Sequence, residues 1–312
     1  MSNPTMQAIR VHEYGGPAVM KAETVERPGA QADEALVRIA YAAVIPLDFK
    51  IRNGWLQSVF PVTMPYTPGF YASGVIEAVG PGVTAFNPGD RVFGMIRGAY
   101  AEYGVAKAQE LMTLPDNLSF EEAATIKAGA EAAWKALFTE GELQAGQTVL
   151  LHAAAGGVGQ FAVQLAKWKG ATVIATASAA NLDFVKSLGA DQVIDYTTTR
   201  FEDVVKEADL VVDSVGGETE TRSWSALKKG GIFVSLTQDP SQENAGKHGV
   251  TAKFNTKLLS REDLRQLTEL MAEGTIKAQI DSIFPLSQAA QALEKSEARH
   301  GRGRILLKAD AV

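Results

Sequence analysis

The second half of the sequence alternates between strand-like and helix-like segments, and this alternation constrains the fold most strongly. Buried strands are indicated by "QTVLLHA", "ATVIATAS", "QVIDY", "ADLVVDSVG" and "GGIFVSL", and helices between them by "GVGQFAVQLAKWKG", "NLDFVKSLG", "FEDVVKE" and "TETRSWSALKK". Gly189 is in the position of a helix-ending residue. Repeated βα units of this length predict a parallel, doubly wound sheet.

Before residue 118 the pattern is different. Short alternating runs such as "EALVRIAYA", "SGVIEAVG", "DRVFGMI" and "AYAEYGVA" are separated by Pro and Gly clusters, which is typical of an antiparallel β domain. The last part of the chain alternates again, with helices predicted at "SREDLRQLTELMAEG" and "SQAAQALEKS" and strands at "IDSIFP" and "GRILLK". We therefore expect an α/β protein with one antiparallel and one parallel sheet.

Composition narrows the possible functions. A chain of 312 residues is long enough for two domains, and a net charge of -6 argues against nucleic acid as a partner. With no cysteine, disulfides and cysteine-ligated zinc sites are excluded, and the four histidines are scattered without ligand spacing: His12, His152, His248 and His300. We therefore expect no metal. No secretory signal and no apolar run long enough to span a membrane is present, so we expect a cytoplasmic protein.

The turn "LLHAAAGGVGQ" follows the first strand of the βα series. It matches AxxGxxG, from Ala153 through Gly156 to Gly159, rather than the full GxGxxG pattern. Backbone amides and the start of the following helix can hold a pyrophosphate at such a turn. A purely structural turn is the alternative, but the position within the first βα unit favours dinucleotide binding.

The end of the next strand bears on which dinucleotide binds. NAD-binding units usually carry an acidic residue there for the ribose hydroxyls, and "ATASAAN" has none. Ser178 and Asn181 could donate hydrogen bonds to a 2'-phosphate, and the hydroxyl of Tyr196 could add a third. Alternatively, Ser178 and Asn181 only cap the helix that begins there. The pattern favours NADP(H) over NAD(H).

Along its whole length the chain resembles the zinc-independent quinone and enone reductases of the medium-chain dehydrogenase/reductase superfamily. The resemblance rests on "MQAIRVHEYGGP", "PLDFKIRNG", "MPYTPGF", "GVIEAVGPGVTAFNPGDRVFG", "GAYAEY", "LPDNLSFEEAA", "HAAAGGVG", "SLGADQVIDY", "DSVGG" and "RGRILLK". It implies a GroES-like catalytic domain at 1–122, completed by 275–312, and a Rossmann NADP(H)-binding domain at 123–274. It also implies a homodimer and a small-molecule quinone or carbonyl substrate.

The resemblance implies a reaction and a set of site residues. Members of the family transfer a hydride from NADPH to a quinone or an enone, and the oxyanion that develops must be stabilised and protonated. Lys50 stands where many quinone reductases have Tyr, and is the candidate for this role; a surface lysine paired with Asp48 is the alternative. The implied cofactor contacts are Pro46, Ala132, Ala155, Gly156, Gly157, Val158, Gly159, Ser178, Asn181, Tyr196, Val215, Gly216, Leu236, Thr237 and Phe254.

Four positions depart from the family pattern. Ile45 replaces an Asn, Tyr71 an Asp, Lys127 a Pro and Ala132 a Thr, which suggests a remodelled substrate pocket. Tyr71 is a further catalytic candidate because its hydroxyl could move protons.

Lys127 leaves several interpretations open. It stands where the segment 120–138 is predicted to form two short helices. It could be a surface lysine paired with Glu131, a polar group of the pocket, or an amine nucleophile for Schiff-base chemistry. The sequence therefore supports two hypotheses. One is an NADPH-dependent reductase. The other is a reductase scaffold with weakened hydride transfer that acts through Lys127 or only binds NADPH.

Overall fold

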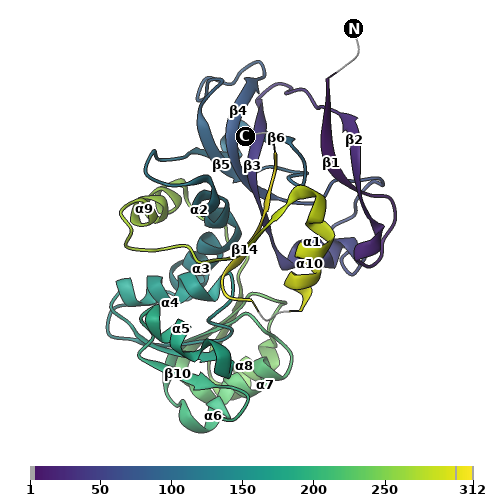
Figure 1. Ribbon diagram of the computed structural model, residues 1–312. Coiled ribbons are helices and arrows are strands. Elements are labelled where there is room, and N and C mark those ends of the chain that lie inside the picture. Colours follow the sequence, from purple (N-terminus) through teal and green to yellow (C-terminus); the bar gives the residue numbers. More distant parts are fainter. Residues whose placement is uncertain (1–3, 299–300, 311–312) are drawn as a thin grey trace. The chain divides into compact units, whose positions relative to one another are not determined.

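The computed structural model describes residues 4–298 and 301–310. The chain forms two compact units, one made of Met1–Ala128 with Ile280–Val312 and the other of Gly129–Gln279 (Figure 1). Both divisions fall a few residues after the boundaries expected from the sequence. We call these the first and second unit and describe each by itself.

The first unit is built around antiparallel strands. Its larger sheet has seven strands in the order β14-β15-β3-β4-β5-β7, with β6 also paired to β3, and β1 and β2 form a separate antiparallel pair. The strands are β1 Thr5–Val11, β2 Met20–Glu26, β3 Glu34–Val44, β4 Tyr71–Val79, β5 Arg91–Met95, β6 Tyr103–Lys107, β7 Leu111–Thr113, β14 Ile280–Pro285 and β15 Arg304–Lys308. The antiparallel domain expected from the alternating runs is confirmed.

The end of the chain completes this unit. β15 runs antiparallel to β3, with Leu306 opposite Ala43, and β14 lies parallel to β15. Helix α10, Ala289–Glu297, contacts α1, Pro46–Arg52. The expected return of the last strand to the first domain is confirmed.

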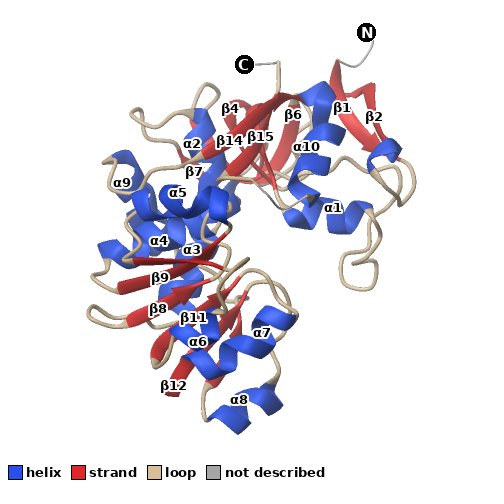
Figure 2. Ribbon diagram, turned by 60° about the horizontal axis from the view of Figure 1, so that its bottom comes forward, coloured by secondary structure: helices blue, strands red, loops and turns tan. Residues whose placement is uncertain are grey.

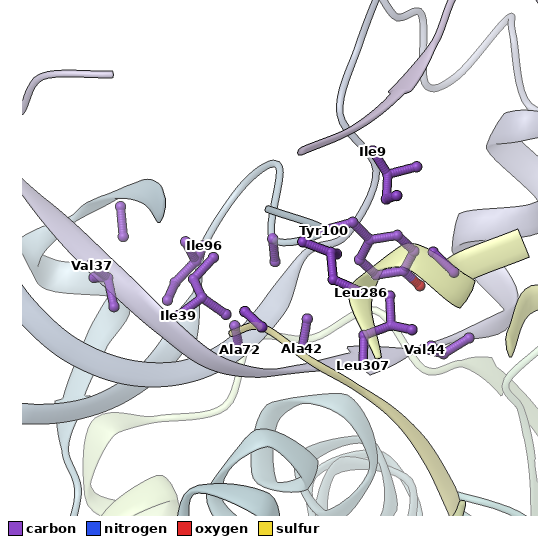
Figure 3. Close-up of a cluster of buried hydrophobic side chains, with 14 of the residues drawn as sticks. Ile9, Val37, Ile39, Ala42, Val44, Ala72, Ile96, Tyr100, Leu286 and Leu307 are labelled. Carbon is purple, nitrogen blue, oxygen red and sulfur yellow. The ribbon is translucent and has the colours of Figure 1, made fainter. Parts of the chain in front are cut away.

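The core of the first unit lies against β3 (Figure 3). Along this strand the core residues are first Val37 and Ile39, at odd positions, and then Ala42 and Val44, at even positions. A register shift between Ile39 and Tyr41 separates the two sets. Because side chains alternate between the faces of a strand, the irregularity lets one long strand keep the same face buried on both sides of it.

The second unit contains the predicted parallel sheet. Its six strands have the order β10-β9-β8-β11-β12-β13, and all of the pairs are parallel (Figure 2). The strands are β8 Thr148–Leu151, β9 Thr172–Ala177, β10 Gln192–Asp195, β11 Ala208–Asp213, β12 Leu227–Ser235 and β13 Thr251–Phe254. The helices are α4 Gly159–Trp168, α5 Leu182–Ser187, α6 Phe201–Val204, α7 Glu218–Ser223, α8 Gln242–His248 and α9 Arg261–Ala272. The doubly wound class is confirmed.

Two local expectations are wrong. The segment expected to form two short helices is one continuous helical stretch, in which α2, Phe120–Thr125, and α3, Glu131–Trp134, alternate with π-helical turns at Ile126–Ala130 and Lys135–Glu140. Lys127 therefore lies within a π-helical turn. In addition, β12 begins at Leu227, where a helix was expected, because Leu227 already pairs with Ala208 of β11.

Candidate functional site

The glycine turn connects β8 to α4 as expected. α4 begins at Gly159, and a Cβ atom at that position would lie 2.4 Å from the carbonyl oxygen of Ala153. Only glycine therefore lets the helix start so close to the strand exit. The first amides of a helix have no partner within it, so Val158 and Gly159, which directly follow Gly157, present donors at the edge of the sheet. This arrangement fits the pyrophosphate of a dinucleotide.

The loops after β11 and β12 meet at the same edge. Asp213 is fully buried, and its carboxylate accepts hydrogen bonds from the amides of Val215 at 2.8 Å and Gly216 at 3.1 Å. Burial raises the pKa of Asp213. A Cβ at Gly216 would lie 2.7 Å from Oγ1 of Thr237, and the amide of Leu236 donates to the carbonyl of Asp213 at 2.8 Å. The four cofactor candidates of these loops, Val215, Gly216, Leu236 and Thr237, are thus brought together.

Three further candidates meet at the ends of β9 and β10. Asp195 is aligned with Ala177, and the amide of Tyr196 donates to the carbonyl of Ala177 at 3.2 Å. The side-chain amide of Asn181 donates to Oγ of Ser178 at 3.2 Å. Neither side chain makes a helix-capping hydrogen bond, which contradicts the alternative that they serve only as caps. Tyr196 is half exposed.

Lys50 lies on the short helix α1 of the first unit, whose first residue is Pro46. The carboxyl group of Asp48 is buried and accepts hydrogen bonds from the amide of Ile45 at 2.8 Å and the hydroxyl of Tyr100 at 2.9 Å. Burial raises the pKa of Asp48 to about 7, against the lowering effect of these bonds and of the nearby Arg304. Asp48 thus anchors the start of α1 inside the unit, while the side chain of Lys50 is partly exposed.

Arg52 holds the other end of α1. Its fully buried side chain donates to the carbonyl of Gly15 at 3.0 Å and forms an ion pair with Glu297 of α10 at 3.1 Å. Asp48 and Arg52 therefore fix the two ends of this helix.

Two of the four departures from the family pattern lie in one apolar cluster of the first unit. Ile45 and Tyr71 pack there with Ala124 and Ala128 of the helical stretch. Lys127 is partly buried and lies between the buried residues Ile126 and Ala128. The catalytic roles of Lys50, Tyr71 and Lys127 stay predictions.

One polar residue at the edge of the parallel sheet was missed by the sequence reasoning. Asn255 follows Phe254, the last residue of β13, and its side-chain amide donates to the carbonyl of Ala132 at 3.0 Å. The signal that was available is its position directly after a predicted strand end. The buried Asp213 was also missed, although it ends the strand in "ADLVVDSVG".

The described residues contain no group of three or more His, Cys, Asp or Glu side chains that could hold a metal ion. His152 is buried and bonded to the hydroxyls of Thr176 at 3.1 Å and Ser223 at 3.0 Å, and burial lowers its pKa to about 3. His300 lies outside the described residues. Among residues 4–298 and 301–310, none of the helices has the length and apolar character that a membrane span requires.

The two units and the glycine turn together define a medium-chain dehydrogenase/reductase. Two family models match the chain, the alcohol dehydrogenase GroES-like domain at residues 31–116 and the zinc-binding dehydrogenase at residues 188–307. A chloroplastic quinone-oxidoreductase, QR1 of Triphysaria versicolor, is 33% identical, and the match covers 99% of this chain and all of the relative. The chain belongs to the zinc-independent quinone oxidoreductase family of this superfamily.

Solved structures agree with the assignment. The quinone oxidoreductase from Coxiella burnetii has a TM-score of 0.88 and 34% identity, covering 98% of this chain and 99% of that one. A mycobacterial protein complexed with NADPH has a TM-score of 0.87 and 29% identity, covering 97% of this chain and 99% of that one.

Proposed function

We propose that this protein is an NADPH-dependent reductase that transfers a hydride to a quinone, an enone or a similarly activated double bond. The observation that carries the proposal is the edge of the parallel sheet at which its strands end. There the glycine turn after β8, which has no room for a Cβ at Gly159, lies beside the end of β9, which carries no acidic residue. The family membership and the NADPH-bound mycobacterial neighbour support the same cofactor.

The residues at this edge suggest a division of roles for the cofactor. Amides of Gly157, Val158 and Gly159 would bind the pyrophosphate. Ser178, Asn181 and Tyr196 form a polar corner of hydroxyl and amide groups, which could donate hydrogen bonds to a 2'-phosphate. The carboxylate of the nearby Asp195 is engaged by the amide and hydroxyl of Thr197 at 2.9 and 2.7 Å.

Lys50 is proposed to stabilise the oxyanion that forms on the substrate. NADPH supplies the hydride when it is bound, and a positively charged donor held in a fixed position lowers the energy of the negative charge that develops. The anchoring of α1 by Asp48 and Arg52 supports this role, because both ends of the short helix that carries Lys50 are tied to the body of the unit.

The test is NADPH oxidation, followed by absorbance, with a panel of quinones and enones. Lys50→Met is expected to lower kcat/KM by about 100-fold, in the usual range for losing a positioned acid or charge, with NADPH affinity unchanged. Lys21→Met, which removes an exposed lysine of β2, serves as the matched control and should behave like the unaltered protein. Tight NADPH binding without turnover of any acceptor would refute the reductase and favour a protein that only binds NADPH.

We also propose that the protein forms a homodimer and acts in the cytoplasm, the two remaining expectations from the sequence. The resemblance to the reductase family supports the first, and a cysteine-free sequence, which suits a reducing compartment, is consistent with the second. Analytical ultracentrifugation tests the first, and imaging of a tagged chain in its source cells tests the second.

A further inference from the structure

The edge of the parallel sheet carries one polar group whose hydrogen bonding is incomplete. The side chain of Asn255 donates through Nδ2 to the carbonyl of Ala132 at 3.0 Å, while its Oδ1 atom is buried and has no hydrogen-bond partner among the described residues. The orientation of this amide follows from chemistry, since a carbonyl oxygen can only accept and Nδ2 must face it. A buried acceptor without a donor is destabilising, so its presence needs a reason.

The topology indicates which part of a dinucleotide would lie there. The glycine turn follows β8, and the adenosine corner at Ser178 follows β9, on one side of β8 in the sheet order β10-β9-β8-β11-β12-β13. A dinucleotide crosses the switch point of such a sheet, so its second nucleoside extends over the ends of β11, β12 and β13. Asn255 directly follows β13. Its backbone N–H donates to the backbone carbonyl of Ser235, at the end of β12, at 3.0 Å.

From these observations we infer that Oδ1 of Asn255 accepts a hydrogen bond from the carboxamide NH2 group of the nicotinamide and so positions that ring. The inference rests on the proposed function, since it needs a nicotinamide cofactor. An amide oxygen accepts from any N–H or O–H donor, and the carboxamide NH2 is the donor that the nicotinamide ring carries. Asn255 is thus a positioning residue for the ring that delivers the hydride.

The segment around Asn255 is held in place for this task. The carboxylate of the buried Glu140 accepts from the amide of Lys257 at 3.1 Å and pairs with its ammonium group at 3.2 Å. Lys253 donates to the carbonyl of Glu140 at 2.7 Å. The chain is therefore tied down two residues before and two residues after Asn255, which limits the conformational entropy lost on binding.

The arrangement also explains one departure from the family pattern. Ala132 stands where the resemblance implies a Thr, so the hydroxyl of that position is missing. Asn255 brings a polar side chain to the backbone of the same residue from a different element. A polar group therefore remains beside position 132, although the side chain at that position is apolar.

The test compares ligands that differ only in the donor. The 3-acetylpyridine analogue of NADP+ carries a methyl group in place of the carboxamide NH2, and 2',5'-ADP lacks the nicotinamide half entirely. Calorimetry is expected to show the unaltered protein binding NADP+ about 10-fold more tightly than the analogue, the value of one good hydrogen bond. In Asn255→Leu this ratio should fall to about 1, with affinity for 2',5'-ADP unchanged.

Thr256→Val is the matched control, because Thr256 is the exposed next residue of the same segment, and it should keep the 10-fold ratio. A merely structural role of Asn255 would weaken both dinucleotides equally and leave the ratio intact, which would overturn the inference. So would an unaltered protein that binds NADP+ and the analogue equally well.

A second measurement does not depend on the variant folding. NADP+ labelled with 15N in its carboxamide, bound to the unaltered protein, should show one amide proton shifted downfield and protected from exchange. Two carboxamide protons whose shifts and exchange rates match those of free NADP+ would overturn the inference. Failure of the unaltered protein to bind either NADP+ or 2',5'-ADP would instead refute the proposed function, and the role of Asn255 with it.

Discussion

Replacing Asp48 by Asn should change how the stability of the first unit depends on pH. Asp48 is 1% exposed, and burial raises its pKa from 3.8 to about 7. An acid whose pKa is higher in the folded state binds more protons when folded, so folding becomes less favourable as pH rises from about 4 to about 7. Asn has nearly the same shape and stays neutral at every pH. The variant should therefore not lose stability between pH 4 and pH 7 through this position.

The size of the effect follows from the shift. A difference of about 3 pKa units corresponds to about 4 kcal/mol, because each unit is worth about 1.4 kcal/mol. The effect of the hydrogen bonds from Ile45 and Tyr100 is already contained in this shift, and any bond that Asn cannot make changes its stability by the same amount at every pH. The free energy of unfolding of Asp48→Asn minus that of the unaltered protein should thus increase by up to about 4 kcal/mol between pH 4 and pH 8.

The assay is urea unfolding at several pH values, monitored by hydrogen-exchange mass spectrometry. Peptides from residues 34–52 report on the unit that carries Asp48. Taking the difference between two proteins cancels the titration of all other groups. A difference that stays constant from pH 4 to pH 8 would refute the reasoning.

Glu202→Gln supplies a control of opposite sign, read from peptides of the second unit. The hydrogen bonds from Arg222 lower the pKa of Glu202 to about 2, so its stabilisation is present above its ordinary pKa of 4.5 and is lost as pH falls toward 2. This variant should therefore be less stable than the unaltered protein at pH 7 and similar to it near pH 2.

Two further predictions concern the site. Gly159→Ala places a Cβ 2.4 Å from the carbonyl oxygen of Ala153, so the glycine turn must shift. The affinity for NADPH, measured by fluorescence titration, should then fall at least about 10-fold. An unchanged affinity would contradict the proposal that this turn binds the pyrophosphate. Borohydride reduction with an aldehyde, mapped by mass spectrometry, should label Lys127 no more than exposed lysines such as Lys21 if the protein is a reductase; selective labelling of Lys127 would support the amine catalyst.

The fold was predictable because its signals are local. Alternating runs, the glycine turn and the helix-ending Gly189, whose φ is 106°, each follow from a few neighbouring residues. The wrong expectation for residues 120–138 also has a physical reason. The π-helical turns keep a continuous helical backbone through 120–140, so the pattern of side chains alone suggested a break that the backbone does not have.

The decisive contacts of the site are not local, which is why sequence reasoning missed them. The bond from Asn255 to Ala132 joins residues 123 positions apart, and that from Tyr100 to Asp48 spans 52 positions. Each requires knowing which strand lies beside which. Asp48 in particular has the sequence context of a surface carboxylate, and only the pairing of the strands around it makes it a buried acid.

The departures from the family pattern therefore differ in kind. Ile45 and Tyr71 are accommodated by packing, since both belong to one apolar cluster with Ala128. Ala132 is matched by a hydrogen bond from Asn255 to its carbonyl. Each of these positions is therefore accommodated by contacts within its own unit. The acceptor panel distinguishes a reductase with altered substrate preference from a scaffold that has lost its reaction.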